Sequence, residues 1–265
     1  MIDAVLPVHR RAGFDRRQFD RGQFSLRHLA AAKNGQRVAV CIPAHNEEAT
    51  VGRVVATTAE LRDAAIVDEV VVVDDNSIDT TAEVAAAAGA RVIRRDGPPS
   101  KGAAMRRAVA ASDADVIVFL DADVTNVAPH FVAGLVGPLL LFPDVMLVKG
   151  AYRRSLYGRP GEGGRVTELV ARPLLDRWFP ELADLSQPLA GETALRRAVT
   201  DSVDFDSGYA VEIGLLLDVA ARFGASAIAE VDLGERVHRN RPLEELRFQA
   251  GAVLDAVLRR VDRLS

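Results

Sequence analysis

The sequence predicts an α/β fold in which a mostly parallel sheet, of Rossmann-like type, carries helices on both of its faces. Continuous runs of Val and Ile alternate with helix-like segments through the first half of the chain. Strands of a parallel sheet are buried on both faces, so they consist of unbroken apolar runs. Three such runs carry the prediction, and they cover residues 38–42, 70–74 and 116–120.

The remaining elements follow from periodicity and from stop signals such as Gly89 and Gly224, which suit the position after a helix. We expect further strands over 91–94, 145–152 and 227–232, and helices over 25–32, 47–61, 80–88, 102–111, 131–141, 166–178, 211–223 and 243–264. The chain divides into an N-terminal arm (1–34), a first half (35–124), a second half (125–242) and a C-terminal helix (243–265), all within one domain.

Net charge, cysteine content and the length of the apolar runs exclude several kinds of partner and of site. The 265 residues carry a formal charge of -4, which gives no reason to expect a nucleic-acid partner. The single cysteine, Cys41, excludes an intramolecular disulfide, and its apolar surroundings predict a buried, inert thiol. The longest apolar runs are of strand length, and no signal-peptide pattern is present, so we expect no membrane partner and a cytoplasmic protein.

Polar segments follow the predicted parallel strands. In open α/β sheets, ligands bind beyond the carboxyl ends of the strands, where these loops converge. Loops are commonly polar in any case, so their position alone proves little. The four segments read PAHNEE (43–48), DDNSIDT (74–80), PPSKG (98–102) and DADVTN (121–126).

Asp121-Ala122-Asp123 directly follows the strand over 116–120. Both carboxylates of an Asp-x-Asp can project together from a strand end, because side chains alternate there. Two neighbouring carboxylates resist joint ionisation, and a hard divalent cation removes that difficulty. The alternative is that one of the two aspartates merely caps the next helix.

The segment 43–48 differs from the phosphate-binding loops of nucleotide-binding folds. It has no G-x-G-x-x-G, and no G-x-x-x-x-G-K-[ST] occurs in the chain. Asn46, Glu47 and Glu48 offer amide and carboxylate groups suited to a ribose or a base. The two glutamates fit equally well in the first turn of a helix, where the helix dipole favours them.

Taken in order, V-C-I-P-A-H-N-E-E, V-V-V-D-D-N-S-x-D-x-T, S-K-G-A-A and V-F-L-D-A-D resemble the nucleotide-sugar-binding half of GT-A glycosyltransferases. In the second half, G-G-R-V-T-E-L-V-A-R-P-L-L (163–175), Q-P-L-A-G-E (187–192), G-Y-A-V-E-I-G-L-L (208–216) and H-R-N-R-P-L (238–243) are similar to glucosyl-3-phosphoglycerate synthases and their mannosyl relatives. The resemblance covers roughly residues 25–255 and implies the GT-A fold.

The resemblance also implies roles for the donor side of the site. Asp123 and His238 would ligate Mg²⁺ or Mn²⁺, Asp121 would lie near the ribose or the sugar, and Glu212 would hold sugar hydroxyls, so Asp121, Asp123 and Glu212 form the expected catalytic set. Lys101 would help to bind the base or the diphosphate. The nucleotide-sugar would further contact Pro43, Ala44, Asn46, Glu48, Asp75 and Ala122.

On the acceptor side, the resemblance implies that Gly164, Arg165, Val166 and Thr167 bind a phosphate and a carboxylate, assisted by Asn240 and Arg241. The implied reaction is transfer of glucose from UDP-glucose to 3-phosphoglycerate with retention of configuration, by a homodimeric enzyme. Two alternatives stay open: GDP-mannose or another sugar nucleotide with a different phosphorylated acceptor, and a nucleotide-sugar-binding protein without catalysis. A solvated basic loop remains the alternative for the sequence around His238.

Overall fold

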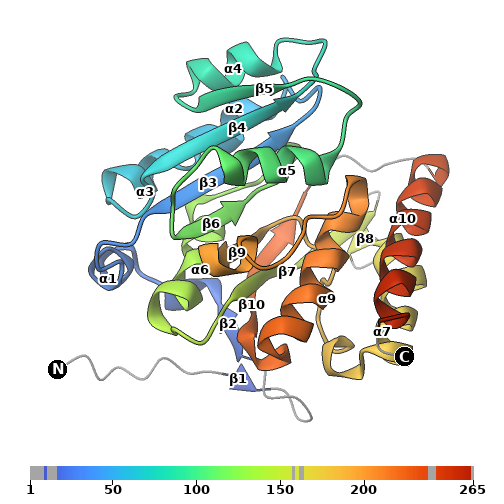
Figure 1. Cartoon of the computed structure of the whole chain (residues 1–265). Coiled ribbons are helices and arrows are strands. Elements are labelled where there is room, and N and C mark those ends of the chain that lie inside the picture. The colour runs from blue at the N-terminus through green and yellow to red at the C-terminus, as the bar shows by residue number, and fades with distance from the viewer. Residues whose placement is uncertain (1–8, 11–16, 157–158, 161–163, 238–242, 264–265) are drawn as a thin grey trace.

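The computed structural model describes residues 9–10, 17–156, 159–160, 164–237 and 243–263 (Figure 1). Its described strands form one ten-stranded sheet with the order β1-β2-β10-β7-β9-β6-β3-β4-β5, and β8 pairs with β7 off this path. The strands are β1 (His9–Arg10), β2 (Arg17–Asp20), β3 (Val38–Ala44), β4 (Glu69–Asp75), β5 (Arg91–Arg95), β6 (Val116–Phe119), β7 (Leu147–Leu156), β8 (Arg159–Pro160), β9 (Thr193–Arg196) and β10 (Ile228–Arg236).

The sheet is mostly parallel, as predicted. Within it, β6, β3, β4 and β5 run parallel to one another, and β10 runs parallel to both β7 and β2. Strand β9 lies between β6 and β7 and is antiparallel to both. The residues that enter β9 therefore lie at the same end of the sheet as the residues that leave β6.

Helices cover both faces of the sheet, which again confirms the prediction. One face packs against α1, α2, α3, α4 and α6, and the other packs against α5, α7, α9 and α10. Figure 1 shows α7, α9 and α10 gathered on one side of the molecule. The helices are α1 (Leu26–Ala32), α2 (Val51–Ala56), α3 (Ala59–Asp63), α4 (Thr81–Ala87), α5 (Lys101–Ala110), α6 (Pro129–Leu141), α7 (Arg172–Trp178), α8 (Arg197–Thr200), α9 (Val211–Phe223) and α10 (Leu243–Val261).

The unbroken apolar strands have a direct structural cause. In β3, Val38 and Ile42 belong to the hydrophobic core on one face, whereas Ala39 and Cys41 belong to the core on the other. Successive side chains of a strand point to opposite faces, so a strand covered on both sides needs apolar residues at every position. Cys41 is fully buried and burial raises the pKa of its thiol to about 12, which confirms the inert role expected for it.

Two predicted helices differ from the structure. The helix expected over 47–61 is divided into α2 and α3, because the hydroxyls of Thr57 and Thr58 donate to the carbonyls of Arg53 (3.0 Å) and Val55 (2.7 Å) at the break. The helix expected over 166–178, with an interruption at Pro173, consists of a π-helical turn (Thr167–Ala171) followed by α7, whose first turn holds Pro173.

Strands β2 and β9 are not among the elements predicted from the sequence. Part of the N-terminal segment, predicted to be an arm, joins the sheet when β2 pairs with β10, and Phe19 of β2 packs against Phe24 and Phe142. Strand β9 has only four residues and ends in Arg196, so its apolar run is too short to be recognised. None of the described helices is long and apolar enough to span a membrane.

The close packing of α6 on the N-terminal segment gives a prediction about stability. A Cβ atom at Gly137 would lie 2.3 Å from the ring of Phe24. We expect Gly137→Ala to lower the free energy of unfolding by about 1–3 kcal/mol, the usual cost of overpacking a core. Gly251→Ala in α10 is the matched control, because a Cβ atom there meets no atom within 4 Å. Urea unfolding of both variants measures the difference, and an unchanged midpoint for Gly137→Ala would contradict it.

Candidate active site

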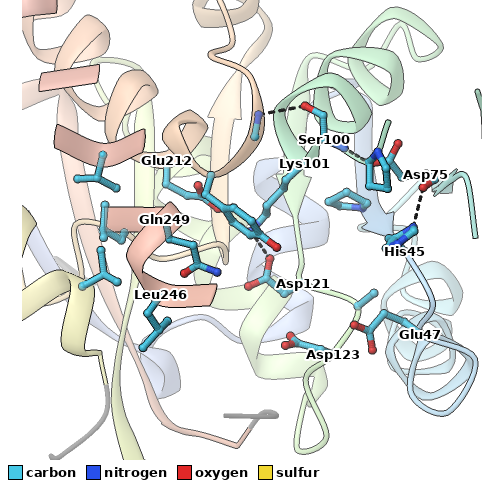
Figure 2. Close-up of a pocket in the computed structure, with 18 of the residues that line it drawn as sticks. His45, Glu47, Asp75, Ser100, Lys101, Asp121, Asp123, Glu212, Leu246 and Gln249 are labelled. Atoms are coloured by element: carbon cyan, nitrogen blue, oxygen red, sulfur yellow. Dashed lines mark hydrogen bonds and ion pairs between the residues drawn. The ribbon is translucent and has the colours of Figure 1, made fainter. Parts of the chain in front are cut away.

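A cavity of about 320 Å³ opens at the carboxyl ends of β3, β4 and β6 (Figure 2). The start of α5, the residues before and within α9, and one face of α10 form the remaining walls. The lining residues named in the sequence analysis are Pro43, Ala44, Asp75, Lys101, Asp121, Ala122, Asp123, Gly164, Arg165, Val166, Thr167 and Glu212. The structure therefore brings together most of the predicted donor and acceptor residues in one place.

Lys101 joins two carboxylates at the centre of this cavity. It is the first residue of α5, whose N-cap Ser100 accepts a hydrogen bond from the Gly208 N–H (3.0 Å), which links α5 to the segment before α9. The Lys101 Nζ lies 2.5 Å from Asp121 Oδ1 and 2.6 Å from Glu212 Oε1. Burial lowers the pKa of Lys101, but Asp121 and Glu212 outweigh burial and raise it above the usual value, so the ammonium stays charged.

Arg236, at the end of β10, forms three further ion pairs with carboxylates, one of them with the second oxygen of Asp121. Its side chain is buried, with its Nε 2.6 Å from Glu192 Oε1 and its Nη2 2.7 Å from Asp121 Oδ2 and 3.2 Å from Asp123 Oδ1. Burial raises the pKa of Asp123, Arg236 opposes this rise, and the negative charges of Asp121 and Glu192 add to it. This crowding of carboxylates is the condition that a bound cation relieves.

The placement of Asp123 fits a divalent cation. No group of three or more His, Cys, Asp or Glu side chains suited to a metal occurs within the described ranges, and His238 lies outside them. The residue just before it is nevertheless tied to the loop that carries Asp123. The Val237 N–H donates to Asn126 Oδ1 (2.8 Å), and the Thr125 N–H donates to the Val237 carbonyl (3.0 Å). Val237, the last described residue before position 238, is thus bonded to Thr125 and Asn126, which follow Asp123 in the chain.

The first two loops hold each other through side chains predicted to touch the donor. The side-chain Oδ1 of Asn46 accepts from the Ile78 N–H (2.9 Å), and Glu48 Oε2 accepts from the Thr80 hydroxyl (2.6 Å). Neither residue lines the cavity, whereas their neighbours His45 and Glu47 do. Asn46 and Glu48 therefore shape the loop over 43–48, and we expect Pro43, Ala44 and Glu47 to face the nucleotide.

Asp75 lines the cavity but is also held by the protein. It accepts hydrogen bonds from the Arg95 Nε and from the Ser100 N–H (2.6 Å), and it is almost fully buried. Its carboxylate therefore links the end of β4 to the start of α5. A nucleotide base in this part of the cavity would meet an acceptor whose position is already fixed.

The acceptor side begins at a helix N-terminus. Gly164 has a φ of 83°, which favours glycine, and its carbonyl accepts from the Glu168 N–H (3.0 Å) in the first turn of the helical segment. N–H groups at such a terminus attract anions, and Arg165 lies in the same turn. Asn240 and Arg241, the other two predicted acceptor residues, lie outside the described residues.

Three charged residues of the site were missed by the sequence analysis: Lys149, Glu192 and Arg236. Arg236 had been included in a basic segment around His238, and the structure shows it buried at 3 % exposure. Glu192 is fully buried, and the Q-P-L-A-G-E segment gave no hint of its partner. The amino-acid composition could have drawn attention to Lys149. Only three of the 33 basic residues are lysines, and the other two are Lys33 and Lys101.

The chain is similar to known glycosyltransferases. The model of glycosyl transferase family 2 matches residues 39–168. Glucosyl-3-phosphoglycerate synthase of Mycolicibacterium paratuberculosis is 47% identical over 258 residues, which cover 92% of this chain and 78% of that protein. The Petrotoga mobilis enzyme of the same name is 39% identical over 264 residues, covering 94% and 81%.

A solved structure is equally similar. Glucosyl-3-phosphoglycerate synthase from Mycobacterium tuberculosis, in complex with Mn²⁺, UDP-glucose and phosphoglyceric acid, superimposes with a TM-score of 0.84 and 43% identity. The match covers 96% of this chain and 86% of that chain. Identity of this extent over most of both chains establishes more than a shared fold. The chain belongs to the glucosyl-3-phosphoglycerate synthase family of GT-A glycosyltransferases.

Proposed function

We propose that this protein transfers glucose from UDP-glucose to the hydroxyl of 3-phosphoglycerate, with retention of configuration, and releases UDP. The observation that carries the proposal is the cavity itself, which is lined both by the Asp-x-Asp carboxylates and by the helix N-terminus at Gly164 and Arg165. The first feature suits a sugar nucleotide, and the second suits a small phosphorylated acid. The solved relative holds both kinds of ligand together with Mn²⁺, and another of its structures holds Mg²⁺ and UDP.

The charges of the cavity suit a donor accompanied by a cation. Asp121, Asp123 and Glu212 line the cavity and pair with Lys101 and Arg236, so the charges of these five residues nearly balance. A divalent cation held by Asp123 and His238 would supply positive charge against the leaving diphosphate. Because the cation and the diphosphate largely cancel each other, the donor enters without disturbing the balance of the buried residues.

In the reaction, the bond between the glucose anomeric carbon and the diphosphate oxygen breaks, and a bond to the acceptor oxygen forms on the same face of the sugar. The acceptor proton passes to the released diphosphate oxygen. Lys101 is ion-paired with both Asp121 and Glu212, which holds these carboxylates in place as charged acceptors for sugar hydroxyls. The protein thus contributes orientation and fixed charge rather than a covalent nucleophile.

The deciding experiment is a donor-by-acceptor screen with and without Mn²⁺ or Mg²⁺. Products from UDP-glucose, GDP-mannose and other sugar nucleotides with 3-phosphoglycerate are identified by mass spectrometry. Metal-stimulated formation of glucosyl-3-phosphoglycerate supports the proposal. A larger product yield from GDP-mannose would change the assigned donor, and a larger yield with another phosphorylated acceptor would change the assigned acceptor. Tight binding of UDP-glucose without turnover of any acceptor would identify a binding protein instead. Both substrates are intracellular metabolites, so we place the enzyme in the cytoplasm.

Asp123 provides a test of the metal assignment. Asp123→Asn removes one charged oxygen ligand, so we expect the affinity for Mn²⁺ in the presence of UDP, and metal-stimulated transfer, to fall by about 100-fold. Isothermal titration calorimetry measures the affinity for Mn²⁺, and the rate of product formation measures metal-stimulated transfer. Asp113→Asn, which alters an exposed partner of Arg37, is the control. Wild-type affinity for Mn²⁺ in Asp123→Asn would remove Asp123 from the metal site.

Arg165 provides a test of the acceptor site. Arg165→Lys keeps the charge but loses the planar fork that binds phosphate or carboxylate through two parallel bonds. We expect the KM for 3-phosphoglycerate to rise about tenfold, the cost of about 1.4 kcal/mol, while the affinity for UDP stays unchanged. Arg177→Lys, near the end of α7, is the control on the same helical segment. A KM equal to that of the wild type would place the acceptor elsewhere.

We further propose that the enzyme is a homodimer that associates through α10. Leu243, Leu254 and Leu258 form an exposed apolar stripe on this helix. Two antiparallel copies of this 19-residue helix can bury these leucines against each other. We expect Leu254→Glu with Leu258→Glu to give monomers, measured by light scattering after size-exclusion chromatography. A wild-type protein that elutes as a monomer at micromolar concentration would contradict the homodimer.

A further inference from the structure

Lys149 is a buried lysine that the proposed chemistry does not use. It lies on β7, is 1 % exposed, and donates from its Nζ to the carbonyl oxygen of Ala190 (2.7 Å). The same carbonyl accepts from the Thr193 hydroxyl (3.1 Å). A buried ammonium is costly, and burial among apolar residues is normally avoided for lysine. Its presence behind the active site therefore requires an explanation.

The segment that Lys149 holds forms part of the cavity. Residues 187–192, which we call the Gly191 loop, enter β9 and contribute Leu189 to the cavity lining. Gly191 itself packs directly on the DAD segment, since a Cβ atom there would lie 2.3 Å from both carboxylate oxygens of Asp121. Any displacement of the Gly191 loop would therefore move Asp121 or leave a gap beside it.

Strand β7 fixes the Gly191 loop on both sides of the glycine. The Lys149 side chain bonds Ala190 on one side, and the Gly150 N–H donates to the Glu192 carbonyl (2.9 Å) on the other. Glu192 in turn carries the ion pair to Arg236. Lys149 therefore influences the reacting centre only through other residues. In this it differs from Lys101, which contacts Asp121 directly.

The choice of lysine is also informative. Arginine is used for almost every basic position of this chain, and lysine remains at three. The guanidinium is large and planar and stays protonated, whereas the ammonium is compact and can lose its proton when buried. A single carbonyl in a closed space between β7 and β9 suits the compact group.

We propose that Lys149 is a positioning residue for the sugar transfer, one that holds the Gly191 loop through Ala190 so that Asp121 and Leu189 stay in place against the donor. The inference rests on the proposed function of the cavity. The groups that face Lys149 are Glu212 from α9, Lys101 from α5, Glu192 from the Gly191 loop and Asp121 from the end of β6.

The geometry gives Lys149 a pH dependence of its own. Burial lowers the pKa of Lys149 to about 8, with Lys101 acting in the same direction and the three carboxylates acting against it. The ammonium is therefore present below pH 8 and is lost above it, which weakens the bond to Ala190. Between about pH 8 and the ordinary lysine pKa near 10.4, the native state binds fewer protons than the unfolded state, so this group's contribution to stability rises with pH. Activity and stability respond in opposite directions.

The test compares Lys149→Met with the wild type. Methionine has a similar length, but it removes the charge and the donor. We expect kcat to fall at least about tenfold, because small misplacements near reacting groups have large effects on rate. The affinity for UDP and the Tm at pH 7 should not fall. In the wild type, kcat should decline as the pH rises through about 8, and Lys149→Met should lack this decline.

Lys33→Met is the matched control, because Lys33 also donates to a backbone carbonyl, that of Ala65 (2.9 Å), outside the cavity. An unchanged kcat in Lys149→Met, or a loss of kcat together with a lowered Tm and weaker UDP binding, would overturn the inference. So would a decline near pH 8 that persists in the variant. UDP-glucose hydrolysis without acceptor serves as a second measure of rate, so a failure to use 3-phosphoglycerate would refute the proposed function while Lys149 is still tested.

Discussion

The active site depends on the mutual neutralisation of buried charges. Asp121 is the centre of this arrangement, because Lys101 and Arg236 approach its two oxygens from opposite sides. Removing either partner would leave one oxygen of the Asp121 carboxylate without its ion pair, and breaking a buried ion pair usually costs several kcal/mol. Asp121 is therefore held in place by two ion pairs of the protein itself, before any ligand enters.

The same arrangement explains how distant parts of the chain are fixed relative to one another. Lys101 begins a helix on one face of the sheet, Asp121 ends a central strand, and Arg236 ends a strand near the other edge. Each ion pair thus spans two elements, and Glu192 ties Arg236 to the antiparallel strand β9. A preorganised set of charges of this kind needs no rearrangement during the reaction, which is the main source of electrostatic catalysis.

The fold was largely predictable from sequence, and the site only in part. The strands β3, β4 and β6 and the helix α9 were recognised because continuous apolar runs and a 3.6-residue period are strong local signals. Lys101, Asp121, Asp123 and Glu212 were recognised because their motifs recur in a known family. Glu192 and Arg236 were not, since their significance lies in a contact between segments 44 residues apart in sequence, and no local pattern records it. Asn46 and Glu48 show the converse, since residues inside a recognised motif bond to the neighbouring loop rather than line the cavity.

The position of β10 has a consequence for biosynthesis. This strand is inserted between β7 and β2, so a segment that begins at Ile228 pairs with one that ends at Asp20 and is synthesised long before it. Such contacts between distant segments form late, because chain closure must precede them. On the ribosome, the nucleotide-binding strands can assemble while Arg236 is still in the exit tunnel. At that stage Asp121 pairs with Lys101 but lacks its second partner, Arg236. A nascent chain would hence acquire its fold by stages but its catalytic competence only after β10 has been added to the sheet.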